Sequence, residues 1–182
     1  MIAGPIGSGK TTVADLLARR YASASRSVAI ADLDDVAFMQ RGVRDIPEFW
    51  RRAGIAHSAL VLGWFDSGID VVIAHGPFFE SRSYDSLFAS AKTGSRTHHV
   101  LLSVPFDIAL QRVTADPERG SSALSKNPDF LRSAHDAFAE LDLPPADYTF
   151  DTSSLTATEI VERLATLLLE SRAATQPRST PE

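Results

Sequence analysis

The stretch GPIGSGKTT, from Gly4 to Thr12, gathers glycine, lysine and hydroxyl side chains near the start of the chain. It matches the pattern G-x-x-x-x-G-K-[ST] of a phosphate-binding P-loop. Glycines let successive backbone N–H groups turn inward around an anion, and the positive end of a following helix adds to the same spot. The residues expected to bind a nucleotide are Gly7, Ser8, Gly9, Lys10, Thr11 and Thr12.

The surroundings of this motif favour a P-loop over a glycine-rich turn before an ordinary helix. The apolar residues MIA precede it, and Val13, Leu17 and Tyr21 follow at helical spacing. Within the motif, Lys10 would reach the β- and γ-phosphates and the Thr11 hydroxyl would bind Mg²⁺. Only three residues precede the motif, whereas a buried strand usually has about five or six. We therefore expect either a very short first strand or a start of translation upstream of Met1.

A cluster of carboxylates follows the second predicted strand, at residues 27–32. Asp32, Asp34 and Asp35 lie in the sequence ADLDD, and the carboxyl ends of parallel strands are where α/β proteins bind ligands. Three carboxylates together are costly unless a cation or a substrate hydroxyl uses them. At least one is therefore a candidate catalytic residue, although one or two could simply cap the next helix.

Two arginines are candidates for contact with phosphate groups. Arg112 lies in a predicted helix, and Arg119 follows in a polar segment that we expect to be a mobile lid, residues 115–128. A mobile arginine can stabilise the charge that spreads over the γ-phosphate oxygens during transfer. The alternatives are a surface helix residue and a solvated loop charge. Lys126 and Arg132 are weaker candidates for the same lid.

The segments after strands two and three would form the acceptor pocket. Strand three ends at His75, where a Walker-B carboxylate would stand. A histidine at a strand end can equally be a hydrogen-bonded structural residue, and Trp50 can belong to the core. The candidates for contact with the acceptor are Asp35, Arg41, Trp50 and His75, with Arg44, Phe49, Arg51, His57 and Phe78 as further lining residues.

Apolar runs alternate with helical patterns along the chain, which is typical of a parallel α/β sheet. Asp45 is a predicted N-cap and Thr156 with Glu159 a predicted capping box. Further strands are expected at 70–76, 98–104 and 147–151, and helices at 46–65, 106–113, 129–142 and from 157 to about 172. On the first of these helices, the side expected to pack inward carries Phe49, Ala53, Ala56, Leu60 and Gly63. We expect one domain, residues 1–172, and a disordered tail, residues 173–182.

The composition narrows the function classes. The chain has 182 residues, a net charge of −5 and no cysteine. The negative charge and the lack of a long basic cluster argue against nucleic acid as a partner, and without cysteine there is no disulfide. No apolar run is long enough to span a membrane, and no signal peptide is visible. These features fit a cytoplasmic enzyme, and no feature specifies an oligomeric state.

Marks of other P-loop classes are missing, since the sequence has no N-K-x-D, D-x-x-G or LSGGQ. The order of motifs along the chain is the P-loop, the acidic end of strand two, a helical segment, an arginine after strand four, an arginine-bearing lid and the sequence FDTSSLTATEIVERL. This order resembles that of the small P-loop kinases. These include shikimate-kinase-like, chloramphenicol-phosphotransferase-like and zeta-toxin-like ATP-dependent phosphotransferases. The resemblance implies a three-layer fold with a five-stranded parallel sheet ordered 2-3-1-4-5, helices on both faces and a mobile lid.

The resemblance also implies roles for individual residues. Asp34 would accept the proton of the acceptor hydroxyl, and Asp32 would hold Mg²⁺ through water. Arg112 would pack on adenine, and Arg119 would close over the phosphates. We therefore expect an ATP- and Mg²⁺-dependent kinase acting on a hydroxyl of a small molecule, an antibiotic among the candidates. The alternatives are a nucleoside or nucleotide kinase, a toxin-type sugar-nucleotide kinase and a non-catalytic ATP-dependent switch.

Overall fold

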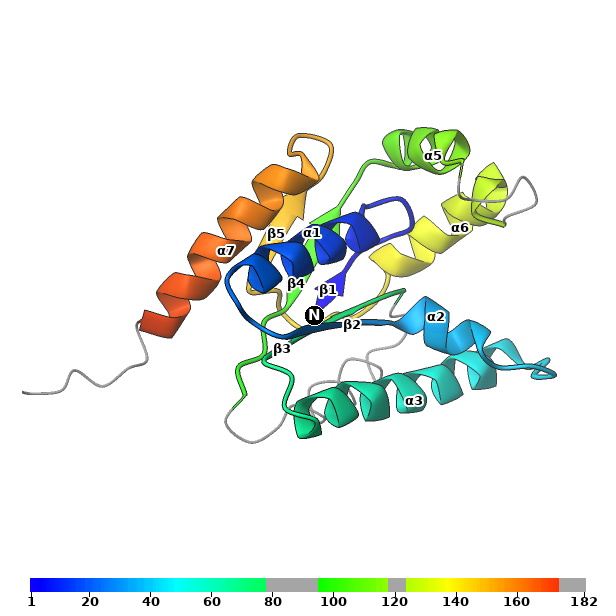
Figure 1. The fold of residues 1–182 in the computed structure, drawn as a ribbon. Helices are drawn as coiled ribbons and strands as arrows, with labels where there is room; N and C mark the ends of the chain where they lie inside the picture. Colours follow the sequence, from blue (N-terminus) through cyan, green and yellow to red (C-terminus); the bar gives the residue numbers. More distant parts are fainter. Residues whose placement is uncertain (78–94, 118–123, 174–182) are drawn as a thin grey trace, which may run out of the picture.

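A computed structural model describes residues 1–77, 95–117 and 124–173 of the chain, and it contains one five-stranded sheet. All the neighbouring strands pair in parallel, in the order β2-β3-β1-β4-β5, which confirms the expected order (Figure 1). The strands are β1 (Ile2–Ala3), β2 (Val28–Asp32), β3 (Val71–His75), β4 (Val100–Ser103) and β5 (Tyr148–Asp151).

Helices flank this sheet on both sides. In Figure 1, α1 and α7 lie together on one side of the sheet and α3 runs along the other. Within the described residues, no helix is both long and apolar enough to cross a lipid bilayer. The helices are α1 (Lys10–Ser23), α2 (Leu33–Phe38), α3 (Ile46–Asp66), α5 (Phe106–Ala115), α6 (Pro128–Ala139) and α7 (Ala157–Ala173), with a 3₁₀ turn, η1, at Leu124–Lys126.

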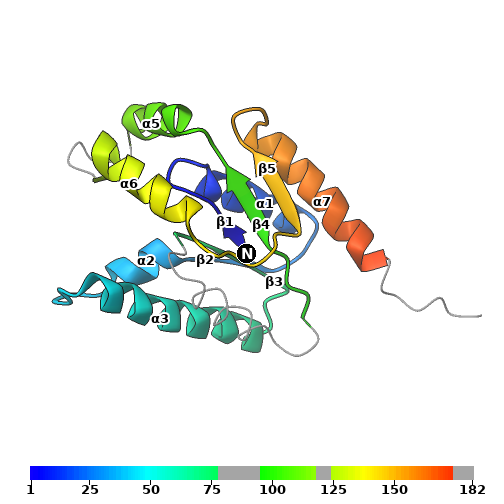
Figure 2. The same cartoon turned by 180° about the vertical axis from the view of Figure 1, so that it is seen from behind.

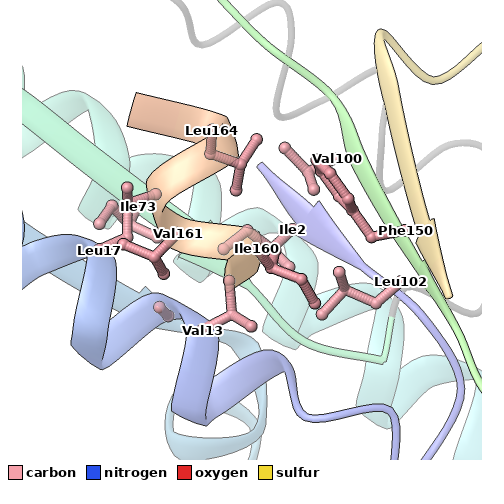
Figure 3. Packing of buried hydrophobic residues seen from close by; sticks show 11 residues of the cluster. Ile2, Val13, Leu17, Ile73, Val100, Leu102, Phe150, Ile160, Val161 and Leu164 are labelled. Carbon is pink, nitrogen blue, oxygen red and sulfur yellow. The ribbon is translucent and has the colours of Figure 1, made fainter. Parts of the chain in front are cut away.

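Alternation along the strands divides the core into two clusters. On the α1/α7 side, large apolar residues of the two helices and of the sheet interlock, as Figure 3 shows. On the α3 side, the strand residues are small, namely Ala3, Ala31 and Ala74, and they face Ala53 and Val61 of the helix. Small side chains on this face leave α3 close to the sheet. The larger cluster consists of Ile2, Val13, Ala14, Leu17, Ile73, Val100, Leu102, Phe150, Ile160, Val161 and Leu164.

Both predicted helix caps are confirmed. The Asp45 carboxylate accepts a hydrogen bond from the backbone N–H of Glu48 at 2.9 Å. Thr156 and Glu159 form the reciprocal capping box, in which the backbone N–H of Glu159 donates to the Thr156 hydroxyl (3.2 Å) and that of Thr156 donates to the Glu159 carboxylate (2.8 Å). These motifs were readable because a cap is decided within four residues of the chain.

The predicted inward face of α3 is correct only near the start of the helix. Ala53 is buried and Phe49 packs against the core on this side, but Ala56 is exposed. Leu60 and Gly63 are exposed. The helix is rotated because His57, a polar residue, is buried and donates through Nε2 to the carbonyl of Ala31 at 2.9 Å. That hydrogen bond satisfies the ring inside the core, so the apolar pattern alone points to the wrong side. The residues that α3 buries are Ala53, Gly54, His57, Ser58 and Val61.

The expected lid and tail are only partly described. Residues 118–123, which include Arg119, and residues 174–182 lie outside the described part of the chain. At the ends of the lid, residues 124–126 form η1, so the expectation of irregular structure is wrong there. Lys126 donates to the carbonyl of Asp116 at 3.0 Å, which ties the two ends of the segment together.

Gly76, directly after β3, lies against the start of α2, and it provides a test of this packing. A Cβ at Gly76 would come 2.5 Å from the Cβ of Leu33. Gly76→Ala should therefore lower the free energy of unfolding by about 1–3 kcal/mol, the usual cost of overpacking. Urea unfolding of the variant and the wild type measures this change in unfolding free energy.

Gly63 is the matched control for this substitution. It lies inside α3, and nothing comes within 4 Å of a Cβ placed there. Gly63→Ala should raise the free energy of unfolding by about 0.5–1 kcal/mol because alanine is the better helix former. Changes of the same sign in the two variants would contradict this description of the β3–α2 contact.

The buried His57 predicts a loss of stability in mild acid. Burial lowers the pKa of His57, against opposing effects of the Ala31 carbonyl and the Asp32 carboxylate. As pH falls below about 6.5, the unfolded chain therefore binds a proton before the folded chain does, and stability present at neutral pH is lost. His57→Gln should make the fall in unfolding free energy between pH 7 and 5 shallower, by at most about 1.4 kcal/mol per pH unit. Identical slopes in chemical denaturation would show that His57 does not contribute.

Candidate active site

The P-loop joins β1 to α1, and its shape requires glycine. Gly7 has a φ of 81°, and a Cβ on it would come 2.9 Å from the Cβ of Ala109 in α5. Gly9 is the N-cap of α1, also in the left-handed region. The Ser8 side chain between them is fully buried, and its hydroxyl has no hydrogen-bond partner within the described residues. The loop therefore packs tightly and keeps an unused polar atom in its interior.

The backbone carbonyls of residues 4–7 all accept hydrogen bonds from side chains. Lys10 Nζ donates to the first two, at 3.0 Å each. His135 of α6 donates through Nε2 to the third at 2.8 Å, and Arg112 of α5 donates to the fourth at 3.2 Å. Since the carbonyls are engaged by these groups, the loop is held in place from three helices.

Arg112 also connects the P-loop to the end of β5. Its guanidinium donates to the hydroxyl of Thr152 at 2.9 Å and to the carbonyl of Thr152 at 2.6 Å. The same hydroxyl donates to the carbonyl of Ser103 at 3.1 Å, so the end of β4 joins the network. A pocket of about 200 Å³ opens beside these groups, lined by Ser8, Gly9, Thr12, Val13, Arg112, Thr152, Leu155, Thr156, Ala157 and Ile160.

The three carboxylates at the end of β2 have different surroundings. Asp32 is the N-cap of α2, and its Oδ1 accepts from the backbone N–H of Asp34 at 2.8 Å. Helix capping, the alternative for one or two of these acids, therefore holds for Asp32. Asp34 is half-buried in the first turn of α2, where the helix dipole favours a negative charge, and Asp35 is exposed.

His75 stands beside Asp32 at the end of β3. The two residues are in register across β2 and β3, and His75 also pairs with Ile2 of β1. His75 is 2% exposed, and its Nδ1 lies 3.7 Å from Oδ2 of Asp32. Burial lowers the pKa of His75 while the Asp32 carboxylate opposes this effect. A neutral imidazole therefore occupies the place of the Walker-B carboxylate, and its contact is with Asp32.

The candidates on the acceptor side do not form one cluster of cations. Arg41 is exposed and donates to the backbone carbonyls of Phe38 and Gln40. Trp50 is half-buried against the α3-side core, with its ring edge-on to that of Phe49 at 5.3 Å between centroids. Phe78 lies outside the described residues.

On the lid side, Arg132 of α6 is engaged within the protein. Its guanidinium lies 3.5 Å from the ring centroid of Phe106, a cation–π contact. The same ring packs edge-on against His135, which in turn donates to the P-loop. The sequence pointed to neither His135 nor Thr152 individually. Thr152 has a recognisable position directly after a strand, whereas His135 has no local signal.

The donor set fits ATP and Mg²⁺ in different ways. The buried Ser8 hydroxyl, the glycine conformations and the Lys10 ammonium suit a phosphate chain. Among the described residues, no group of three or more histidines and acids could hold a metal ion. Mg²⁺ nevertheless fits as an ion held chiefly by phosphates and water, with the exposed Thr11 hydroxyl and the Asp32 carboxylate as the available protein oxygens.

Comparison with solved structures finds two kinases and an antibiotic resistance protein among the similar chains. A shikimate kinase from Acinetobacter baumannii, in complex with shikimate, is 24% identical, with a TM-score of 0.54 over 93% of this chain and 92% of that chain. A tunicamycin resistance protein from Deinococcus radiodurans is 18% identical, with a TM-score of 0.56 over 92% of each chain. An APS kinase from Mycobacterium tuberculosis is 14% identical, with a TM-score of 0.57 over 92% of this chain and 93% of that one.

Sequence comparison adds nothing to these structural matches, because no family model matches the chain and no curated protein matches it by sequence. At identities this low, the likeness concerns the fold. The strand order, the P-loop and the almost complete coverage agree with it. The chain therefore has the fold of the small P-loop kinases, which confirms the resemblance seen in the sequence at the level of the fold.

Proposed function

We propose that this protein is an ATP-dependent phosphotransferase that moves the γ-phosphate to a hydroxyl of a small molecule. One observation carries the proposal. A P-loop with its lysine follows β1, and a half-buried carboxylate at the start of α2 follows β2. Both strands are parallel and only β3 separates them, so the two groups lie at the same edge of the sheet. Figure 2 shows the P-loop, α2 and α6 at the same end of the molecule. The fold shared with known kinases supports this assignment.

In the proposed reaction, the P-loop binds the phosphate chain. Its backbone N–H groups and Lys10 hold the phosphates, and the Thr11 hydroxyl with Asp32 would hold Mg²⁺ through its water shell. When bound, the ion neutralises charge on the phosphates. Arg112 and the neighbouring pocket would receive the base of ATP, because about 200 Å³ suits part of a nucleotide rather than the whole.

Asp34 is the proposed general base. The acceptor oxygen forms a bond to the γ-phosphorus as the bond to the β–γ bridging oxygen breaks, ADP leaves with that electron pair, and the hydroxyl proton passes to the Asp34 carboxylate. Asp32 supports this geometry, since its side chain fixes the backbone N–H of Asp34 at 2.8 Å. His75 acts on the same unit through Asp32.

One part of the proposal concerns a residue outside the described part of the chain. Arg119 is the proposed lid arginine that closes over the phosphates.

The remaining parts of the proposal concern domain, partner and location. We propose a single domain over residues 1–172, a small-molecule acceptor without nucleic acid or membrane as partner, and a cytoplasmic location. An antibiotic remains one candidate acceptor. A nucleoside or nucleotide kinase, a toxin-type sugar-nucleotide kinase and an ATP-dependent switch remain the alternatives.

Transfer can be tested by incubating the protein with ATP, Mg²⁺ and a panel of sugars, nucleosides and hydroxylated antibiotics. Lys10→Ala should abolish phosphate transfer while thermal unfolding stays near that of the wild type. The lysine is half-buried and its ammonium donates to two carbonyls of the loop, so its loss removes charge from the phosphate site without opening the core. Unchanged turnover in this variant would rule out a P-loop mechanism.

The assignment of the base can be tested separately. Asp34→Asn should slow transfer about 10²–10⁴-fold, the usual contribution of a general base, while ATP affinity stays near normal. Asp32→Asn should keep the α2 cap, since asparagine caps helices as well, but weaken the dependence on Mg²⁺. Asp35→Asn should have the smallest effect.

The outcome of this series separates a kinase from a switch. Normal transfer by Asp34→Asn together with loss in Asp35→Asn would move the base by one residue. Full ATP turnover in all three variants, with no acceptor found, would favour the ATP-dependent switch.

A further inference from the structure

The arginines on the acceptor side of the site are already bound to a carboxylate. Arg51 and Arg52 of α3 both pair with Glu48, at Nε–O distances of 2.5 Å and 2.6 Å. Hydrogen bonds from Arg51 and then Arg52 lower the pKa of Glu48 to about 2, so its carboxylate stays charged at neutral pH. An anionic acceptor would have to displace this carboxylate to use either arginine.

The other two arginines of this segment offer little more to an anion. Arg41 donates to the carbonyls of Phe38 and Gln40, and its side chain is folded along the end of α2. Arg44 is exposed and makes no ion pair within the described ranges. Of the four guanidinium groups in residues 41–52, two therefore share one carboxylate, one donates to backbone carbonyls and one makes no ion pair within the described ranges, where a site for a phosphorylated acceptor would keep several available.

Aromatic rings occupy the same region. The Phe38 cluster consists of Phe38, Phe49 and Trp50, with ring centroids 6.1 Å apart in the first pair and 5.3 Å in the second. Phe49 and Trp50 are half-buried, but Phe38 is 64% exposed. The Phe38 ring is therefore accessible to a ligand, Phe49 packs against it, and Trp50 packs against Phe49.

The position of Phe38 links this cluster to the proposed base. Asp34 and Phe38 are four residues apart in α2, which places them on the same side of the helix. Leu33 and Ala37, also four apart, are the buried residues of α2. The exposed ring therefore lies one helical turn beyond the carboxylate, on the side that does not pack into the core.

We infer that the acceptor is an uncharged alcohol with an aromatic or apolar group next to its hydroxyl, bound against the Phe38 cluster. Ligand sites use aromatic walls for affinity and few polar groups for orientation. Glu48 keeps Arg51 and Arg52 from binding anionic competitors, so the selectivity comes from exclusion as well as attraction. This inference rests on the proposed function, because it takes Asp34 as the residue that receives the hydroxyl.

The test uses two probes that share a phenyl ring and a hydroxyl but differ in charge. These are 3-phenyl-1,2-propanediol, which is neutral, and 3-phenyllactate, which carries a carboxylate. Trp64→Phe leaves Trp50 as the only tryptophan, so its fluorescence reports binding at the cluster without ATP. The diol should bind about 10-fold more tightly than 3-phenyllactate, because the carboxylate of 3-phenyllactate would lie near those of Asp34 and Glu48. Tighter binding of 3-phenyllactate would overturn the inference.

Two variants and a control locate the effect in the same background. Phe38→Ala should weaken the diol about 3- to 10-fold, as expected for one aromatic contact. Ile55→Ala removes another exposed apolar side chain, 56% exposed against 64% for Phe38, and should leave binding of the diol unchanged. Glu48→Gln should improve 3-phenyllactate binding about 3- to 10-fold and leave the diol alone. Equal effects of Phe38→Ala and Ile55→Ala on diol binding would overturn the aromatic site. No gain in 3-phenyllactate binding with Glu48→Gln would overturn the exclusion of anions by Glu48.

Phosphate transfer with the same probes and with shikimate separates this inference from the proposed function. Transfer that prefers 3-phenyllactate or shikimate would leave a kinase with an anionic acceptor and overturn the inference alone. Selective binding of the diol with no transfer to any alcohol would support the aromatic site and count against the kinase. Transfer to the diol, weakened by Phe38→Ala in KM more than in kcat, would support both.

Discussion

The carbonyl groups of the P-loop constrain much of this structure. A loop that turns its N–H groups toward an anion must direct its carbonyls elsewhere, and every buried carbonyl needs a donor. Here the carbonyls of residues 4–7 are met by Lys10 of α1, Arg112 of α5 and His135 of α6. These hydrogen bonds fix α5 and α6 against the loop, and a Cβ on Gly7 would come 2.9 Å from the Cβ of Ala109, so the loop and α5 are in close contact.

The other side of the loop is organised by the end of β3. His75 pairs in register with Asp32, and Asp32 in turn caps α2 and fixes the N–H of Asp34. The P-loop therefore lies between two polar networks, one built on Arg112 and Thr152 and one built on His75 and Asp32. The first network lines the pocket beside the P-loop, and the second lies at the start of α2.

Most of the fold could be predicted from the sequence because its signals are local. The P-loop pattern, the Asp45 cap and the Thr156–Glu159 capping box are each decided within a few residues. The inward face of α3 could not be predicted, because it depends on the hydrogen bond from His57 to Ala31, 26 residues away. A polar residue in a helical pattern is assigned to the exposed face of the helix unless its distant hydrogen-bond partner is known.

The same reason separates the predictable part of the site from the rest. The sequence placed Arg112 in the site, but its contact with Gly7 spans 105 residues. The contact of His135 with Ile6 spans 129 residues and leaves no trace in local spacing. The pairing of Glu48 with Arg51 and Arg52 lies within one helix at three- and four-residue spacing, and could have been read from the sequence. Arginines counted as free for a phosphorylated acceptor should therefore first be checked for an acid at those spacings.

The partners of the cations also differ in a way that bears on where anions can bind. Lys10 donates to two neutral carbonyls, whereas Arg51 and Arg52 donate to a charged carboxylate. Hydrogen bonds between two ionised groups are about twice as strong as neutral ones, so a phosphate displaces a carbonyl more readily than it displaces a carboxylate. The lysine and the two arginines therefore differ in the charge of the groups that an incoming phosphate would have to replace. An anion at the P-loop meets neutral carbonyls, whereas an anion at Arg51 or Arg52 meets a carboxylate that already pairs with both.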